Sequence, residues 1–142
     1  MPKLFNLKIL TPERKFFDGD VEAVTVTAPD GTATILADHA PFIVPVVVGN
    51  IDIKISGQWR KTVNSEGFME VRSQGVLIFV QTCEHPEEID ERRAEQARKR
   101  AEELLRQKRS MSEYRQSKLA LARAMARLRL SRDYKDNDMY PT

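Results

Sequence analysis

Three residues of different chemistry stand at helical spacing just beyond the middle of the chain. Asp90, Arg93 and Ala94 occupy positions i, i+3 and i+4, which are neighbours on one face of a helix. An acid, a base and a small residue side by side can hold a polar ligand. The same three residues can equally be ordinary surface residues, and the spacing alone does not decide between the two interpretations.

Two arginines farther along the chain can complete an anion site. Arg123 and Arg127 are four residues apart, so both guanidinium groups project from one side of a helix. If that helix closes against the one that carries Arg93, three converging cations repel one another unless an anion lies between them. Phosphates suit such a site. Asp90 can then accept a hydrogen bond from an amine, such as an adenine amino group, and Ala94 leaves room for a flat ring.

The sequence lacks the motifs of common catalytic centres. It has no phosphate loop, no nucleophile elbow and no pair of histidines at metal-ligand spacing. His39 and His85 each stand apart from any cluster of cysteine or histidine. Cys83 ends an apolar run, which favours a small buried residue over a nucleophile. We therefore expect neither catalytic residues nor a metal site.

Cysteine usage and hydropathy bound the compartment. The single cysteine, Cys83, excludes an intrachain disulfide, as is typical of proteins from reducing compartments. No apolar run approaches the roughly 20 residues of a membrane span, and the first residues lack the apolar core of a signal peptide. These features predict a soluble, intracellular protein.

The first part of the chain, residues 1–85, has the pattern of short strands separated by turns. Apolar residues alternate with polar ones in several runs, and no helical pattern interrupts them. Asp18-Gly19, Pro29-Asp30-Gly31 and Ser56-Gly57 are turn signals. Pro45 interrupts an apolar run and indicates an edge strand or a bulge. The pattern predicts an antiparallel β-sandwich or a flattened barrel.

The second part, residues 86–132, is predicted to form two helices. Pro86 suits the first turn of a helix, and residues 86–109 are rich in strong helix formers. Ser110 and Glu113 form a capping box that starts a second helix, which we expect to end near Ser131. The apolar stripes are narrow, so an antiparallel hairpin of these helices buries little area at ~25 cal/mol per Å² and is easily displaced. The last ten residues, 133–142, are polar and are expected to be a frayed tail.

Charge is distributed unevenly between these parts. Residues 1–85 carry eight basic and ten acidic side chains, whereas residues 86–132 carry fourteen basic and eight acidic ones. The second predicted helix holds most of the excess. Its cations can form a solvated face, bind nucleic acid or dock on an acidic protein surface. Nucleic-acid binding lacks the stacking aromatic residues that it needs.

Several motifs, in a fixed order, resemble one known family. They are G-D-V-E-A-V-T-V at 19–26, A-P-D-G at 28–31, I-L-A-D-H-A-P at 35–41, G-F-M-E-V at 67–71 and I-D-E-R-R-A at 89–94. With the helical pattern behind them, the chain resembles the epsilon subunits of bacterial F-type ATP synthases over residues 3–132.

The resemblance implies a sandwich of about ten strands (residues 1–85), a regulatory helical hairpin (86–132) and a flexible tail (133–142). Such subunits belong to the rotor, where the sandwich binds the gamma subunit and the c ring. They couple proton transport to ATP synthesis without a catalytic site. The extended hairpin meets the alpha and beta subunits and inhibits ATP hydrolysis. The resemblance also implies a peripheral place on the cytoplasmic face of the cell membrane, membrane contact only through the complex, and no nucleic acid.

The resemblance further implies a regulatory ATP site and no catalytic cofactor. In some members the motif I/L-D-x-x-R-A binds ATP when the hairpin is folded down. By match, the site residues are Glu84, Ile89, Asp90, Arg93, Ala94, Arg123 and Arg127. Bound ATP would then favour the closed hairpin by mass action.

The chain departs from the family pattern near the loop that is expected to lie at the c ring. Thr32 replaces a common glutamate, and Thr34 and Asp38 replace glycines. The rotor contacts therefore cannot be carried over in detail. The alternative to a rotor subunit is a stand-alone sandwich adaptor whose basic hairpin binds acidic proteins or nucleic acid.

Overall fold

The computed structural model describes residues 2–107 and 111–138. Strands of alternating apolar and polar residues form the first part of the chain, and helices form the second. The chain divides into two compact units, Met1–Glu84 and His85–Thr142. The predicted fold class, an antiparallel β-sandwich of about ten strands followed by a helical hairpin, is confirmed.

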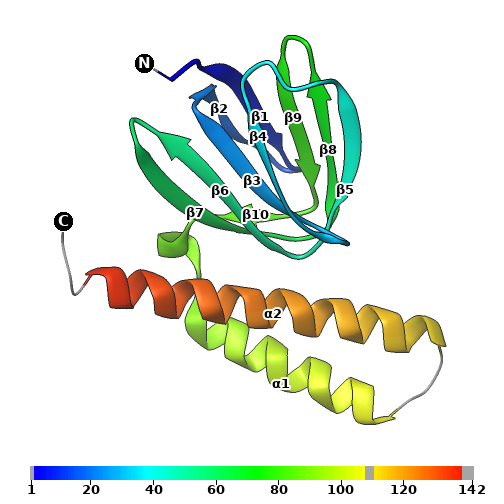
Figure 1. The fold of residues 1–142 in the computed structure, drawn as a ribbon. Helices are drawn as coiled ribbons and strands as arrows, with labels where there is room; N and C mark the ends of the chain where they lie inside the picture. Colours follow the sequence, from blue (N-terminus) through cyan, green and yellow to red (C-terminus); the bar gives the residue numbers. More distant parts are fainter. Residues whose placement is uncertain (1, 108–110, 139–142) are drawn as a thin grey trace. The chain divides into compact units, whose positions relative to one another are not determined.

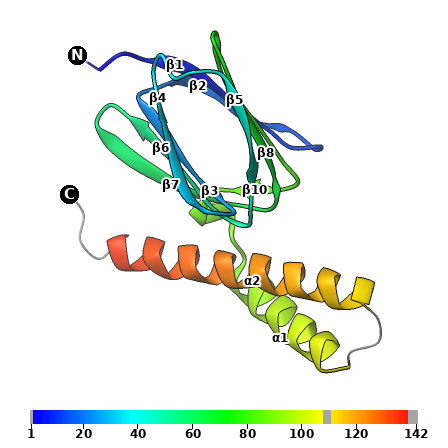
Figure 2. The same ribbon diagram turned by 45° about the vertical axis from the view of Figure 1, so that its right-hand side comes forward.

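The first unit contains two five-stranded sheets that face each other (Figure 1). The first sheet has the order β2-β1-β9-β8-β5, formed by Lys15–Val21, Phe5–Leu10, Gly75–Val80, Gly67–Arg72 and Phe42–Val46. The second sheet has the order β10-β7-β6-β3-β4, formed by Cys83–Glu84, Gln58–Asn64, Gly49–Ile55, Ala23–Ala28 and Gly31–Leu36. Figure 2 shows the space between the sheets from another side.

The core lies between the inner faces of the two sheets. Strand alternation turns every second side chain inward, which buries Leu7 and Ile9 of β1, Ile51 and Ile53 of β6, and Ile78 of β9. Burying each of these side chains contributes about 1.5–3 kcal/mol. This core is what makes the sandwich a stable unit.

One strand pair of the first sheet is parallel. Strand β1 runs parallel to β9, with Leu7 beside Val76 and Ile9 beside Ile78, whereas the other pairs are antiparallel. Gly75, at the start of β9, has φ +149°, and a Cβ there would lie 2.5 Å from the Asn6 carbonyl oxygen. The close approach of β1 therefore requires glycine at this position.

The turn predicted at Asp18-Gly19 was wrong. Both residues lie within β2, where they pair with Lys8 and Leu7 of β1. The chain turns earlier, where the Thr11 N–H donates to the Arg14 carbonyl at 2.9 Å. Because β2 is an edge strand, Gly19 is tolerated there without marking a turn. The edge position predicted from Pro45 is confirmed, because β5 ends its sheet.

The helices begin and end elsewhere than predicted. A 3₁₀ turn, η1 (Pro86–Glu88), comes first; Ile89 is then extended, and α1 (Glu91–Gln107) begins only after Asp90. The second helix, α2 (Met111–Asp138), passes the predicted end at Ser131 and includes the first part of the predicted tail. No glycine or proline follows until Pro141, so nothing stops the helix there. The capping box predicted at Ser110 lies outside the described residues.

The two helices lie side by side as an antiparallel pair (Figures 1 and 2). Their buried residues include Ala94 and Ala101 of α1 and Ser117, Ala124 and Ser131 of α2. Small side chains allow close approach but bury little apolar area. Tyr114, Leu119 and Met125 of α2 are more than one-third exposed, whereas Leu128 and Leu130 are buried. The buried surface of the hairpin therefore consists of small side chains and a few leucines.

Replacing Gly67 by alanine should destabilise the sandwich. A Cβ at Gly67 would lie 1.9 Å from the Phe79 carbonyl oxygen, in backbone that cannot move without shifting β9. We expect a loss of about 1–3 kcal/mol in the free energy of unfolding, as for other overpacked sites. Urea denaturation followed by the fluorescence of Trp59 measures it.

Gly19→Ala is the matched control for this prediction. The nearest contact of its Cβ is a Phe17 ring carbon at 3.4 Å, and its φ lies outside the left-handed region. We expect little change or a slight gain, because glycine weakens strands. Equal losses in both variants would contradict the steric argument.

Candidate functional site

The residues of the predicted ligand motif form the start of α1. The Asp90 carboxylate accepts a hydrogen bond from the Arg93 backbone N–H at 3.2 Å, and the Asp90 carbonyl accepts one from the Ala94 N–H at 3.0 Å. Asp90 is thus the N-cap residue, which satisfies a donor that the helix itself cannot pair. Glu91 adds negative charge in the first turn, where the helix dipole favours it. The structure therefore brings Asp90, Arg93 and Ala94 together, as the spacing predicted.

These three side chains differ in accessibility. Asp90 and Arg93 are exposed, whereas Ala94 is only 4 % exposed. The exposed carboxylate and guanidinium can meet a ligand from solvent. A flat ring could reach Ala94 only by displacing the groups that cover it. Ligand binding at the whole motif would thus require a local rearrangement.

The arginine pair lies on the other helix of the hairpin. Arg123 and Arg127 are both half-buried and stand one turn apart in α2. Leu128 lines a groove with Glu91 and Glu95, so this part of α2 lies level with the first turns of α1. Arg127 is thus placed opposite the start of α1, and Arg123 lies about 6 Å farther along the α2 axis.

The two remaining predicted residues flank the link between strand and helix. Glu84 ends β10, where it pairs with Val63 of β7, and belongs to the sandwich unit. Ile89 is half-buried in the extended step between η1 and α1. Before it, the His85 N–H donates to the Glu88 carboxylate at 3.4 Å, which holds η1 together. Glu84 is therefore joined to the other site residues through this short link.

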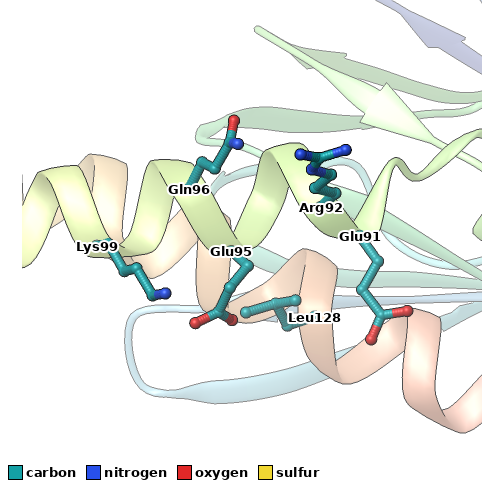
Figure 3. A pocket seen from close by; sticks show the side chains of 6 residues that line it. All are labelled: Glu91, Arg92, Glu95, Gln96, Lys99 and Leu128. Carbon is teal, nitrogen blue, oxygen red and sulfur yellow. The ribbon is translucent and has the colours of Figure 1, made fainter.

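A groove of about 580 Å³ runs along the hairpin, beside the predicted site (Figure 3). Figure 3 shows Leu128 of α2 between the Glu91 and Glu95 side chains of α1. The lining residues are Glu91, Arg92, Glu95, Gln96, Lys99 and Leu128. None of the seven predicted site residues lines it.

The acids of this groove are committed to ion pairs. Lys135 of α2 binds Glu91, and Arg98 binds Glu95 and Glu102 on α1 itself. The hydrogen bond from Arg98 lowers the pKa of Glu95, and the charge of Arg132 in α2 acts in the same direction. At this groove, the ion pair between Glu91 and Lys135 connects the two helices.

The residues of these ion pairs were not predicted from the sequence. The spacing of Glu95, Arg98 and Glu102 was visible as i, i+3 and i+4 pairing along one helix. The pair between Glu91 and Lys135 was not, because it depends on how two helices line up across a gap of 44 residues. Lys135 also fell in the segment that was expected to be a tail.

The side chain of Cys83 lies in the core, as its place at the end of an apolar run predicted. Cys83 is buried and donates to the Thr62 hydroxyl at 3.5 Å, and burial raises the pKa of its thiol to about 12. It is therefore a protonated, unreactive core residue at neutral pH. Within residues 2–107 and 111–138 no group of acids, histidine and cysteine is arranged to hold a metal ion. Among the same residues no helix is long and apolar enough to cross a membrane.

Two family models match the chain, one for each unit. Residues 4–86 match the beta-sandwich domain of the ATP synthase delta/epsilon chain, and residues 87–132 match its long alpha-helix domain. The two matches follow each other with no gap. They meet within η1, between Pro86 and Glu87.

Curated relatives match over nearly their whole length. The ATP synthase epsilon chain of Caldanaerobacter subterraneus subsp. tengcongensis is 48 % identical over 96 % of this chain and 99 % of its own. That of Ruminiclostridium cellulolyticum is 49 % identical over 87 % of this chain and 92 % of its own.

Among solved structures, a chain in the Euglena gracilis mitochondrial ATP synthase has a similar fold. It aligns with a TM-score of 0.75 at 22 % identity, over 89 % of this chain and 80 % of the other. Both units, in order, thus agree with the same protein family, and the chain belongs to the delta/epsilon chains of ATP synthase.

Proposed function

We propose that this protein is a non-catalytic rotor subunit of an F-type ATP synthase. In this role it links the gamma subunit to the c ring, couples proton transport to ATP synthesis and restrains ATP hydrolysis. The observation that carries the proposal is the match of both units, in order and over nearly the full chain, to ATP synthase epsilon chains. Family membership favours this role over a stand-alone adaptor.

An exposed apolar face on the first sheet is suited to the gamma subunit. Phe68 of β8 and Phe79 of β9 stack with ring centroids 6.0 Å apart, and both are exposed. Ile43 on β5 is 69 % exposed. Exposed apolar patches of this kind mark protein interfaces. We therefore assign this face to the interface with the gamma subunit. The proposed complex would be peripheral, on the cytoplasmic face of the cell membrane.

The hairpin has the properties that a mobile brake needs. Its buried seam contains Leu128 and several Ala and Ser residues, and ion pairs such as Glu91–Lys135 add only modest stability because they are partly exposed. A small free energy therefore separates the paired helices from the separated ones. Once released, α2 presents exposed cations, among them Arg115, Lys118 and Arg129, to acidic surfaces of the alpha and beta subunits.

ATP is the proposed ligand of the closed hairpin. Exposed Arg93 and the pair Arg123 and Arg127 supply positive charge for phosphates, and Asp90 supplies an acceptor for the adenine amino group. Glu84, Ile89 and Ala94 complete the proposed site. ATP that binds only the closed hairpin stabilises it by RT ln(1 + [ATP]/Kd). Plentiful ATP would therefore keep the hairpin closed and ATP hydrolysis uninhibited.

ATP titration of the full chain by calorimetry tests the site. Asp90→Ser is the informative variant, because serine still caps a helix but is too short to reach a ligand. We expect it to abolish ATP binding while leaving helix content unchanged by circular dichroism. The double variant Arg123→Gln/Arg127→Gln should have the same effect.

Arg115→Gln/Arg129→Gln is the control of equal charge on α2. Both residues are exposed and lie outside the proposed site, so affinity should stay close to that of the unaltered chain. Unchanged affinity in both the Asp90 and the Arg123/Arg127 variants would overturn the ATP site. An equal loss in the control would mean that only the net charge of α2 attracts ATP.

Removal of residues 86–142 tests the brake separately. The sandwich has its own core, so we expect the shortened chain to assemble with the gamma subunit. ATP hydrolysis by the complex, measured at low ATP, should rise several-fold. A constant rate with normal assembly would show that the hairpin does not restrain hydrolysis.

A further inference from the structure

The hairpin of β6 and β7 carries an aromatic ring between two cations on its outer face. Ile51 and Ile53 of β6 point into the core, so Lys54 points outward, and its cross-strand partner is Trp59 of β7. The Lys54 Nζ lies 5.9 Å from the centroid of the Trp59 ring, within cation–π range. Lys61, two residues beyond Trp59, shares this outer face.

The turn that joins β6 and β7 holds the Trp59 ring in an exposed position. Ile55 pairs with Gln58, so Ser56 and Gly57 form a two-residue turn, with φ values of 52° and 74°. The Gly57 N–H donates to the Glu22 carboxylate at 3.0 Å, which ties the tip to the body of the sandwich. Trp59 is nevertheless 48 % exposed. Trp59 does not belong to the hydrophobic core cluster of the sandwich or to the residues that pack against it.

The charge here is opposite to that of the rest of the unit. Residues 1–85 have a net charge of −2, yet three of their eight cations, Lys54, Arg60 and Lys61, fall within eight residues that contain no acid. Arg60 lies on the other face of the hairpin and is exposed. Glu22 binds the tip, Asp52 lies opposite Lys61, and Glu84 lies opposite Val63, two residues from Lys61; burial raises the pKa of Asp52.

The small area of this hairpin tip favours a membrane surface over a protein as its partner. A stable protein interface needs about 800 Å² and 20–30 residues on each side, which a two-residue turn and its flanking side chains do not supply. A membrane surface needs only a few groups, because tryptophan settles at the headgroup level and each basic residue adds attraction to anionic lipid. We propose that the outer face of the β6–β7 hairpin, formed by Lys54, Trp59 and Lys61, binds the surface of anionic phospholipid membranes.

This contact is distinct from membrane association through a complex, and it can be measured on the isolated chain. Trp59 is the only tryptophan, so its fluorescence reports this site alone. Vesicles of phosphatidylcholine and phosphatidylglycerol should shift its emission to shorter wavelength and protect it from acrylamide. Pure phosphatidylcholine should have little effect, and added salt should weaken the response.

Lys54→Gln/Lys61→Gln should weaken this binding about 25-fold, at about fivefold for each cation. Arg115→Gln/Lys118→Gln on α2 removes the same charge elsewhere and should leave the Trp59 response unchanged. Unchanged Trp59 emission with anionic vesicles would overturn the proposal, even if the chain bound them, because α2 would then be the binding element. A shift with polyglutamate but not with vesicles would overturn it in favour of an acidic protein.

Discussion

The sandwich depends on the parallel pairing of β1 with β9. This pairing joins the first strand of the chain to one that begins some seventy residues later, and it unites β2-β1 with β9-β8-β5 in one sheet. Without it, Leu7 and Ile9 would lose their place over the core. The contact requires the missing side chain of Gly75 next to Asn6. The helical hairpin follows in the chain directly after β10, the last strand of the sandwich.

Local patterns predicted which residues form strands, but they did not predict how the strands are arranged. Alternation identifies the buried face of a strand, such as Ile51 and Ile53, from side-chain type alone. It contains no information on which strand lies beside it, so the β1–β9 pair was not foreseen. Asp18-Gly19 was misread because the same dipeptide suits both a tight turn and an edge strand. Pro45 was informative because its missing N–H excludes a central strand whatever its neighbours are.

The same distinction applies to the candidate site. The grouping of Asp90, Arg93 and Ala94 follows from helix geometry and was predicted from the sequence. The role of Asp90 as N-cap was not, because Pro86 appeared to be the better start. The level of Arg127 relative to α1 depends on how far the helices slide along each other, which Ala94, Ala101 and Ala124 permit but do not specify. Charge across the pair, as between Glu91 and Lys135, helps to select one alignment.

The small residues at the hairpin seam have a consequence for repeated motion. Separating two helices usually exposes a stripe of large apolar side chains, which then attract other chains and aggregate. Here separation would uncover Leu128 together with the methyl and hydroxyl groups of Ala94, Ala101, Ala124, Ser117 and Ser131. Such a surface is hydrated at little cost. Small side chains at the seam thus leave less apolar surface to attract other chains than a stripe of leucines alone would.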